Sequence, residues 1–276
     1  MPEVTILMPV YNGEKYIGEA VNSILNQTFT DFELLIMDDG STDNTARIIE
    51  TYTDNRIRLI RRKHDFISNL NEGLDLAHGE FIARMDADDV MHSERLRIQL
   101  KRMKMYPEIT VCGSWFKKFK QGENPELFKI GEGFIDGPLM LLLRNNFIAH
   151  PSVMIRKSFL TENSIKYDDY PCTEDYKLWF EIAKKKGIFF IEPQYLLFFR
   201  KSDSQVTVLK KDTVIRQSEQ IKNEVLYYLL TQRFNDSSLM ELYSNLMVQQ
   251  GKGLVSNENI FQLFNTVLKN FQTSNS

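Results

Sequence analysis

Cysteine is scarce in this sequence. Cys112 and Cys172 are the two cysteines among 276 residues, and their separation does not match the spacing of a cysteine metal site. The scarcity argues against a cysteine-bound metal as the basis of function. We expect both side chains to be buried as small apolar groups, in a protein of a reducing compartment.

Long hydrophobic runs are also missing. The longest, such as LMLLL at Leu139–Leu143, fall far short of the roughly 20 residues needed to cross a bilayer. The N-terminal stretch MPEVTILMPVYN has neither the basic start nor the long apolar core of a signal peptide. These absences predict a cytoplasmic protein and leave peripheral docking on the inner face of the membrane open.

Neither sign of charge dominates the chain. Lys and Arg number 34 and Asp and Glu 37, a net charge of −3 that gives no reason to expect a nucleic-acid partner. Hydrophobic residues make up 42 % and charged residues 26 %, as in ordinary globular proteins. Two lysine groups, Lys117–Lys120 and Lys184–Lys186, suit either contact with acidic lipid or a solvated face.

Strand-like and helix-like patterns alternate through the first hundred residues. Short apolar runs predict buried strands at Val4–Val10, Phe32–Asp39, Ile57–Ile60 and Glu80–Asp86. Each is followed by apolar residues at helical spacing, as with Ile17, Val21, Ile24 and Leu25. This alternation predicts an α/β fold with a mostly parallel sheet and helices on both faces.

The alternation loosens in the second half. Further strands are predicted at Ile109–Phe119, Ser152–Lys157 and Tyr195–Arg200, and an amphipathic helix at Glu174–Lys185. From about Thr207 the pattern is helical to the end. We therefore predict a domain over residues 1–206 and a helical region over 207–276. The apolar stripes of that region should pack on the domain or on a second copy of the chain.

Polar loops follow all four predicted strands of the first half. They are PVYNGE (Pro9–Glu14), DDGSTD (Asp38–Asp43), HDFISNLN (His64–Asn71) and DADD (Asp86–Asp89). In open parallel sheets, ligands bind outside the carboxyl ends of the strands. Because all four loops lie at such ends, we expect them to form one ligand site.

The acidic loop carries the most specific chemistry. Arg84–Val90 reads RMDADDV, with three carboxylates in four residues that repel one another. In an extended chain Asp86 and Asp88 point the same way, which would suit Mg²⁺ or Mn²⁺ held together with substrate phosphates. Such a cation stabilises a departing diphosphate. The alternative is a solvated acidic turn that caps the following helix.

These loops together resemble the N-terminal half of a family 2 glycosyltransferase of GT-A fold. The similar segments are VTILMPVYNGEKYIGEAVNSILNQTFTDFELLIMDDGSTDNT and LNEGLDLAHGEFIARMDADD, while FIAHPSVMIRKSFL and TEDYKLWFEIA resemble the family's acceptor half. The resemblance covers roughly residues 3–203. It implies inverting, metal-dependent transfer from a nucleotide sugar. The nucleotide-sugar half would span about residues 1–105 and the acceptor half about 106–206.

The resemblance also implies nucleotide-binding residues. Pro9, Val10 and Tyr11 match the nucleotide-binding loop, with the Tyr11 ring against the base. Asp39 matches the acid that bonds the base edge, and Asp86 the acid near the ribose. The alternatives are that Tyr11 belongs to the core and that the DDGST segment is a plain turn.

The metal ligand and the base come from the same resemblance. Asp88 matches the metal ligand, with Asp86, Asp89 and His150 as further candidates that the sequence does not rank securely. Asp175 of TED matches the catalytic base, which would take the proton of the acceptor hydroxyl. The alternatives are that His150 is a structural histidine and Asp175 a simple first-turn helix acid.

Two segments depart from the family pattern. The third loop has Asp65 and Phe66 where the family commonly has Asn-x-Gly, which puts its contacts with base or sugar in doubt. After the last strand Arg200 is kept, but Ser202 stands where the family often has His. If that His helps to hold the metal, another group such as His150 must replace it.

The implied partners are a nucleoside-diphosphate sugar, with UDP favoured, and a saccharide or lipid-linked saccharide acceptor. The pathway implied is bacterial cell-surface polysaccharide synthesis. Two other functions remain open: a nucleotidyltransferase, and a non-catalytic nucleotide-sugar-binding subunit. A nucleotidyltransferase usually has a Gly-rich, basic phosphate loop, where this chain has PVYNGEKY. A homo-oligomer is a further expectation.

Overall fold

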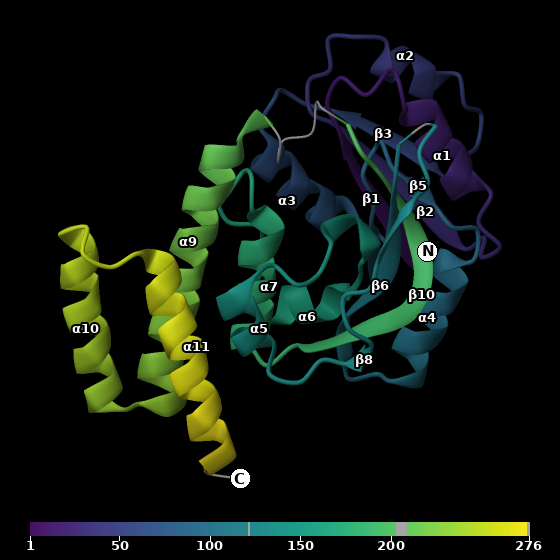
Figure 1. Ribbon diagram of the computed structural model, residues 1–276. Helices are drawn as coiled ribbons and strands as arrows, with labels where there is room; N and C mark the ends of the chain where they lie inside the picture. The colour runs from purple at the N-terminus through teal and green to yellow at the C-terminus, as the bar shows by residue number, and fades with distance from the viewer. Residues whose placement is uncertain (121, 203–208, 275–276) are drawn as a thin grey trace.

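The computed structural model describes residues 1–120, 122–202 and 209–274 (Figure 1). Within these ranges the strands form one mixed, mostly parallel sheet with helices against both faces, which confirms the α/β class. Its order is β3-β2-β1-β4-β9-β6-β10-β5, with β7 paired to β6 and β8 to β10. The strands are β1 (Val4–Val10), β2 (Phe32–Asp38), β3 (Ile57–Arg61), β4 (Phe81–Arg84), β5 (Val90–Met91), β6 (Ile109–Phe119), β7 (Glu126–Phe128), β8 (Gly133–Phe134), β9 (Met154–Arg156) and β10 (Ile188–Arg200).

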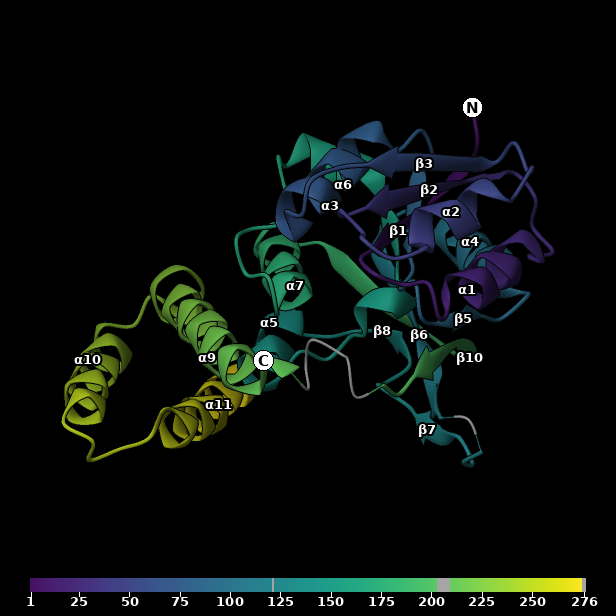
Figure 2. The ribbon, with the colours of Figure 1, turned by 90° about the horizontal axis from the view of Figure 1, so that it is seen from above.

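Helices cover the sheet on two sides (Figure 2). The α-helices are α1 (Ile17–Leu25), α2 (Thr45–Glu50), α3 (Phe66–Leu76), α4 (Arg95–Met105), α5 (Pro138–Arg144), α6 (Lys157–Glu162), α7 (Glu174–Lys184), α9 (Lys211–Tyr228), α10 (Ser237–Gly251) and α11 (Asn257–Ser274). A short 3-10 helix, η1 (His150–Ser152), precedes β9, and a π-helical turn, η2 (Leu229–Phe234), follows α9.

The two-residue period of the strands divides the core between the two faces of the sheet. In β1, Ile6 and Met8 pack with α1, α2 and α4, whereas Leu7 packs with α3. Every residue of β1 and of β2 is buried, as expected for parallel strands covered on both sides. The parallel β1–β2 and β2–β3 pairs therefore bring their following loops to one edge.

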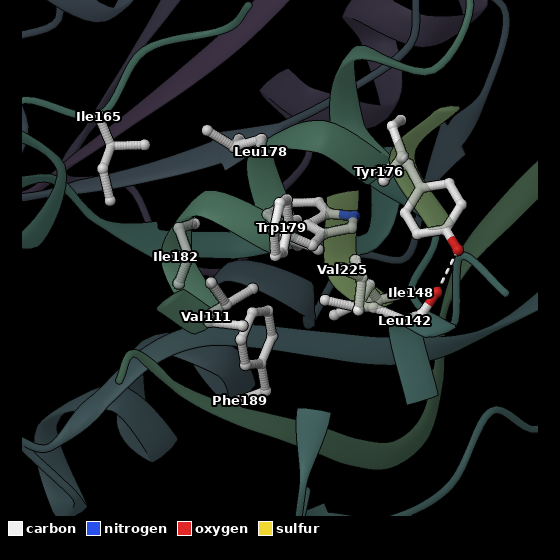
Figure 3. Close-up of a cluster of buried hydrophobic side chains, with 14 of the residues drawn as sticks. Val111, Leu142, Ile148, Ile165, Tyr176, Leu178, Trp179, Ile182, Phe189 and Val225 are labelled. Carbon is white, nitrogen blue, oxygen red and sulfur yellow. Dashed lines mark hydrogen bonds between the residues drawn. The ribbon is translucent and has the colours of Figure 1, made fainter. Parts of the chain in front are cut away.

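One of the two core clusters joins α5 and α7 to the C-terminal helices (Figure 3). Trp179 of α7 is fully buried and lies among Val111 of β6, Phe189 of β10 and Val225 of α9. The Tyr176 hydroxyl of α7 donates to the Leu142 carbonyl of α5, which ties the two helices together. In this way α9 packs directly on the α/β body.

Three sequence-based expectations need correction. The strand predicted to reach Asp86 ends at Arg84, because Asp86–Asp89 fold into a turn closed by a 3.4 Å hydrogen bond from Asp89 N to the Asp86 carbonyl. The last strand begins at Ile188, before the predicted Tyr195, because it continues through a register shift next to Pro193. Cys172 is half-buried and only Cys112 is buried.

The helical region beyond residue 208 is helical as expected, from α9 through α11. The predicted boundary between residues 206 and 207 lies outside the described residues and stays a prediction. No helix in the described part of the chain is both long and apolar enough to cross a membrane.

Candidate active site

Hydrogen bonds join the first two loops at the carboxyl edge of the sheet. Asn12 has a left-handed backbone (φ 49°), and its side-chain oxygen accepts from the Thr42 backbone N–H at 2.8 Å. In return, the Asn12 N–H donates to the Ser41 hydroxyl at 2.9 Å. The Gly13 N–H donates to the Thr45 hydroxyl at 2.8 Å. The polar residues of these loops thus hold each other in position.

Tyr11 lies on the surface and is paired with a histidine. Its side chain is 51 % exposed, so it is not core, and its ring centroid is 4.4 Å from that of His64. The His64 Nδ1 atom lies 2.8 Å from the Oδ2 atom of the Asp39 carboxylate. Tyr11 and His64 therefore present an aromatic pair at the ends of β1 and β3.

Asp39 is buried and organises the third loop. Its Oδ1 atom accepts from the Asp65 backbone N–H at 2.7 Å and from the Asn69 side chain at 2.5 Å. At the place where the chain departs from the family's Asn-x-Gly, the backbone of residue 65 ties the loop to Asp39, while the Asp65 side chain caps α3 by accepting from the Ser68 N–H at 3.2 Å. The other oxygen, Oδ2, is buried and lies beside His64 Nδ1.

Pro9 and Val10 belong to β1 and are buried. The Val10 carbonyl accepts from the Asp39 N–H at 2.8 Å. Their side chains therefore do not reach the edge, and their contribution is to set where Tyr11 leaves the sheet. Of the three residues expected in the nucleotide-binding loop, Tyr11 is the one exposed at the surface.

The acidic turn places three carboxyl groups close together, although not by the extended geometry expected from the sequence. Asp86 forms an ion pair with the buried Arg84. Burial, and secondarily the charge of Asp86, raises the pKa of Asp88 to about 6. Asp89 is 1 % exposed, and burial together with Asp86 and Asp88 raises its pKa well above the usual range. The fold therefore keeps the three carboxyl groups close together despite their mutual repulsion.

The donor set of this turn fits a divalent cation. The Asp89 Oδ2 atom is buried and has no hydrogen-bond partner within the described residues. A cation would remove the repulsion that raises the pKa of Asp88 and Asp89. No group of three or more His, Cys, Asp or Glu side chains in the described ranges is arranged to hold a metal alone. Mg²⁺ and Mn²⁺ commonly complete their shell with substrate phosphates and water. A cation site at the turn therefore does not need three protein ligands.

Arg200, at the end of β10, fixes the acidic turn to the other side of the sheet. Its backbone N–H donates to Asp89 at 2.8 Å, and its Nε–H donates to the Asp88 carbonyl at 2.7 Å. The guanidinium also pairs with Glu19 of α1 and lies over the Tyr16 ring. The family's arginine is therefore a support for the turn.

Arg95 is a supporting residue that the sequence reasoning missed. It is fully buried, and its guanidinium donates to the carbonyls of Arg84, Pro151 and Val153 at 2.7–3.0 Å. Burial lowers its pKa to about 9. The signal in the sequence was a charged residue next to the buried Leu96, at the start of α4. Its positive charge lies beneath the acidic turn and opposes that turn's repulsion.

Asp175 opens α7 and is half-buried. One carboxylate oxygen accepts from the Asn146 side chain at 2.8 Å and the other from the Tyr176 N–H at 2.7 Å. Partial burial, and next the neighbouring Glu174, raises the pKa of Asp175, while the hydrogen bonds oppose that rise. Asn146, which sequence reasoning did not single out, fixes the orientation of this carboxylate.

His150 lies between the two acidic regions. It is 5 % exposed, its Nε2 atom is 2.8 Å from the Tyr167 hydroxyl, and its Nδ1 atom is 3.4 Å from Glu174. Burial and the charge of Arg84 lower its pKa to about 3, while Asp175 and Asp86 oppose this. His150 is thus a neutral group turned toward Tyr167 and Glu174, and we leave it out of the cation site.

Comparison with known proteins agrees with the family resemblance seen in the sequence. Residues 5–163 match the family model described as Glycosyl transferase family 2. The chain is 30 % identical over 262 residues to an uncharacterized glycosyltransferase of Haemophilus influenzae, covering 88 % of this chain and 80 % of that protein. It is also 30 % identical over 244 residues to WfgD of Escherichia coli, a UDP-Glc:alpha-D-GlcNAc-diphosphoundecaprenol beta-1,3-glucosyltransferase, covering 82 % and 90 %.

Solved structures share the fold. S. aureus TarS 1–349 in complex with UDP superposes with a TM-score of 0.62 at 22 % identity, covering 87 % of this chain and 75 % of that one. The mannosyltransferase PcManGT of Pyrobaculum calidifontis, in complex with GDP-Man and Mn²⁺, gives 0.55 at 15 % identity, covering 96 % and 83 %. At these identities the likeness is one of fold.

Proposed function

The chain belongs to glycosyl transferase family 2, and from that premise we propose that it is an inverting, cation-dependent enzyme with Asp175 as its base. The observation that carries the proposal is the position of His150. This buried ring lies 3.4 Å from Glu174, the residue before Asp175 at the start of α7, and it feels the charge of Arg84, which pairs with Asp86 of the acidic turn. This supports one site for the two carboxylates. A donor held at the turn and an acceptor beside α7 would then meet.

In the proposed reaction Asp175 acts as a general base. The acceptor hydroxyl oxygen bonds to the anomeric carbon, Asp175 takes the hydroxyl proton, and the bond from that carbon to the diphosphate oxygen breaks. One displacement inverts the anomeric configuration, so a single carboxylate suffices. Asn146 supports this role because its hydrogen bond holds one oxygen and aims the carboxylate. The raised pKa of Asp175 also makes it a better proton acceptor.

We assign the cation to Asp88 and Asp89, with Asp86 as the third acid of the turn. The chemistry that Mn²⁺ or Mg²⁺ supplies when bound is neutralisation of charge on the departing diphosphate. Arg200 and Arg95 keep the turn in place for this task, since both bond to its backbone or to the strand that leads into it. Tyr11 would stack on the base, and Asp39 would hold the loop that carries His64 beside it.

For the substrates we propose a UDP-sugar donor and a saccharide acceptor, either free or lipid-linked. Support comes from WfgD, whose name specifies UDP-Glc and a diphosphoundecaprenol-linked GlcNAc acceptor. A role in bacterial cell-surface polysaccharide synthesis follows from the same likeness. A lipid-linked acceptor would bring the protein to the membrane surface. Membership of the family does not favour the two alternatives, a nucleotidyltransferase and a non-catalytic binding subunit.

A donor screen tests the proposal. The purified protein is heated with UDP- and GDP-sugars, each with Mn²⁺, with Mg²⁺ or with EDTA. Binding to the folded state raises the unfolding midpoint in proportion to ln(1 + [L]/Kd). We expect a rise with a UDP-sugar plus cation that EDTA reverses, and release of UDP when acceptor is added. A donor that stabilises the protein equally in EDTA would contradict cation dependence.

A further inference from the structure

The segment that leads into the proposed base is tied to a C-terminal helix. Residues 170–173 form a turn closed by a 2.9 Å hydrogen bond from the Thr173 N–H to the Tyr170 carbonyl, and α7 with Asp175 follows directly. Helix α9 lies beside α7 (Figure 1). It lies beyond residues 5–163, the part of the chain that matches the family model. Membership of the family therefore assigns no role to α9.

Thr173 does not cap α7 in the usual way. It is the N-cap residue, yet its side chain makes no capping hydrogen bond with the helix. An N-cap threonine ordinarily accepts from a backbone N–H of the first turn. Here its hydroxyl donates to the Gln217 side-chain oxygen of α9 at 3.3 Å, and the Cys172 N–H donates to the same oxygen at 3.3 Å. The start of α7 is therefore held from outside the helix, by α9.

A second contact joins the same two segments two turns further along α9. The Tyr170 hydroxyl donates to the Glu224 carboxylate at 2.5 Å, and the buried Lys177 of α7 forms an ion pair with the other oxygen of that carboxylate. Gln217, Ile221 and Glu224 have the spacing i, i+4 and i+7, so all three lie on one face of α9. Ile221 is fully buried in the core. The core thus fixes this face of α9, and its two polar side chains hold the turn and the start of α7.

We propose that α9 positions the proposed base: Gln217 and Glu224 hold the turn before α7 and the start of that helix, so that the Asp175 carboxylate stays beside the acceptor. The inference rests on the proposed role of Asp175. The bonds of Asp175 with Asn146 and Tyr176 set the direction of its carboxylate, whereas the contacts of α9 set where its helix begins. Gln217 and Glu224 contact the neighbours of Asp175, so both are positioning residues.

This role predicts a loss in the transfer step and not in donor binding. The acidic turn is supported by Arg200 and Arg95, from β10 and α4, so donor binding should not depend on α9. Gln217→Ala removes the acceptor of two hydrogen bonds. It should lower kcat by roughly tenfold to a hundredfold, because a small displacement of a reacting group can cost that much. The affinity for UDP with Mn²⁺ should remain that of the parent.

Three further variants sharpen the test. Gln217→Glu keeps an acceptor oxygen on a side chain of the same length and should restore most of the turnover. Tyr170→Phe removes the hydroxyl that Glu224 accepts, leaves the ion pair with Lys177 in place, and should lower kcat as well. Gln220→Ala, at an exposed position of α9, should turn over like the parent.

A merely structural role for Gln217 would give a different result. Turnover is measured on complete chains and expressed per UDP-binding site, counted by titration, so that a smaller folded fraction does not lower it. If Gln217 only stabilises the fold, Gln217→Ala has a lower unfolding midpoint but the parent's kcat per site. That result would overturn the inference.

A second readout needs no turnover. The Tyr176 N–H bonds to the Asp175 carboxylate, so its hydrogen exchange, followed by NMR, reports whether that carboxylate stays in place. Exchange at Tyr176 should be faster in Gln217→Ala and unchanged in Gln220→Ala. Parent-like exchange in Gln217→Ala overturns the inference even if Asp175→Asn has lost turnover. If Asp175→Asn retains turnover while exchange in Gln217→Ala is faster, it is the proposed base that fails.

Discussion

Asp88 carries a charge that is costly to hold without a cation. Burial and Asp86 raise its pKa to about 6, so neutralising it should change cation binding far more than folding. We expect Asp88→Asn to abolish the Mn²⁺-dependent part of UDP affinity, measured by titration calorimetry with and without Mn²⁺. Asp75→Asn is the matched control, because Asp75 is an exposed acid of α3 paired with Lys166. Equal enhancement by Mn²⁺ in Asp88→Asn and parent would remove Asp88 from the cation site.

Tyr11 offers a test of base recognition that needs no phosphate. Its ring is half exposed and lies 4.4 Å from His64, so the change to alanine removes a stacking surface without opening a cavity in the core. Stacking of a base on an aromatic ring contributes roughly 1–3 kcal/mol. We expect Tyr11→Ala to weaken uridine monophosphate binding by about that amount, and Tyr227→Ala, an exposed tyrosine of α9, to leave it unchanged. Unaltered affinity in Tyr11→Ala would exclude the stack.

At the scale of elements, α9 forms part of the core and is not a loose appendage. Leu226 is fully buried in the cluster that contains Trp179 and Phe180 of α7. Leu226→Ala should lower the free energy of unfolding by about 2–5 kcal/mol, the usual range for a buried leucine. Leu242→Ala on α10, at a site 37 % exposed, should change it by about 0.5 kcal/mol or less. Urea denaturation followed by Trp fluorescence measures both, since the buried Trp179 reports on this cluster.

The outcome for Leu226→Ala also distinguishes two arrangements of the molecule. If α9 to α11 formed an independent unit, the α/β body would unfold at the parent's urea concentration. Because the two parts share one core, we expect the whole urea transition of Leu226→Ala to shift together.

The strands and their edge could be predicted from the sequence because buried parallel strands have a local signature. β1 and β6 follow the expected bounds, and the loops after β1, β2 and β4 adjoin as the topology requires. The acidic turn could not be predicted in detail. Its conformation depends on Arg200 and Arg95, which approach it from β10 and α4, far away in sequence.

The same reason explains what was missed near the base. Asp175 could be proposed as the base because its motif is local, and its half-burial agrees with the apolar stripe of α7. Asn146 and Tyr167 carry no local signal: each becomes relevant only when the loops before η1 and after α6 approach α7. Long-range contacts between polar side chains are set by the tertiary fold.

At the scale of the whole molecule, one sheet joins the two halves of the site. β9 runs antiparallel between β6 and β4, the strand that leads into the acidic turn. The chain around β9 therefore returns beside that turn, with η1 before β9 and α7 after it. The electrostatics reflect this arrangement. The charge of Arg84 lowers the pKa of His150, Tyr167 and Glu174, which come from the second half of the chain, against or alongside the effect of burial. In the proposed mechanism, the residues for the donor and those for the acceptor would therefore share one buried electrostatic network.

The central claim is that Asp175 removes the acceptor proton in a single inverting displacement. The most direct measurement is turnover of Asp175→Asn, with the anomeric configuration of the parent's product read by NMR. Asparagine keeps the size of the side chain but accepts no proton. Turnover should therefore fall by roughly 10²–10⁴ while donor and Mn²⁺ still raise the unfolding midpoint. The product should have the configuration opposite to the donor's. Near-normal turnover in Asp175→Asn, or a product of retained configuration, would contradict the account.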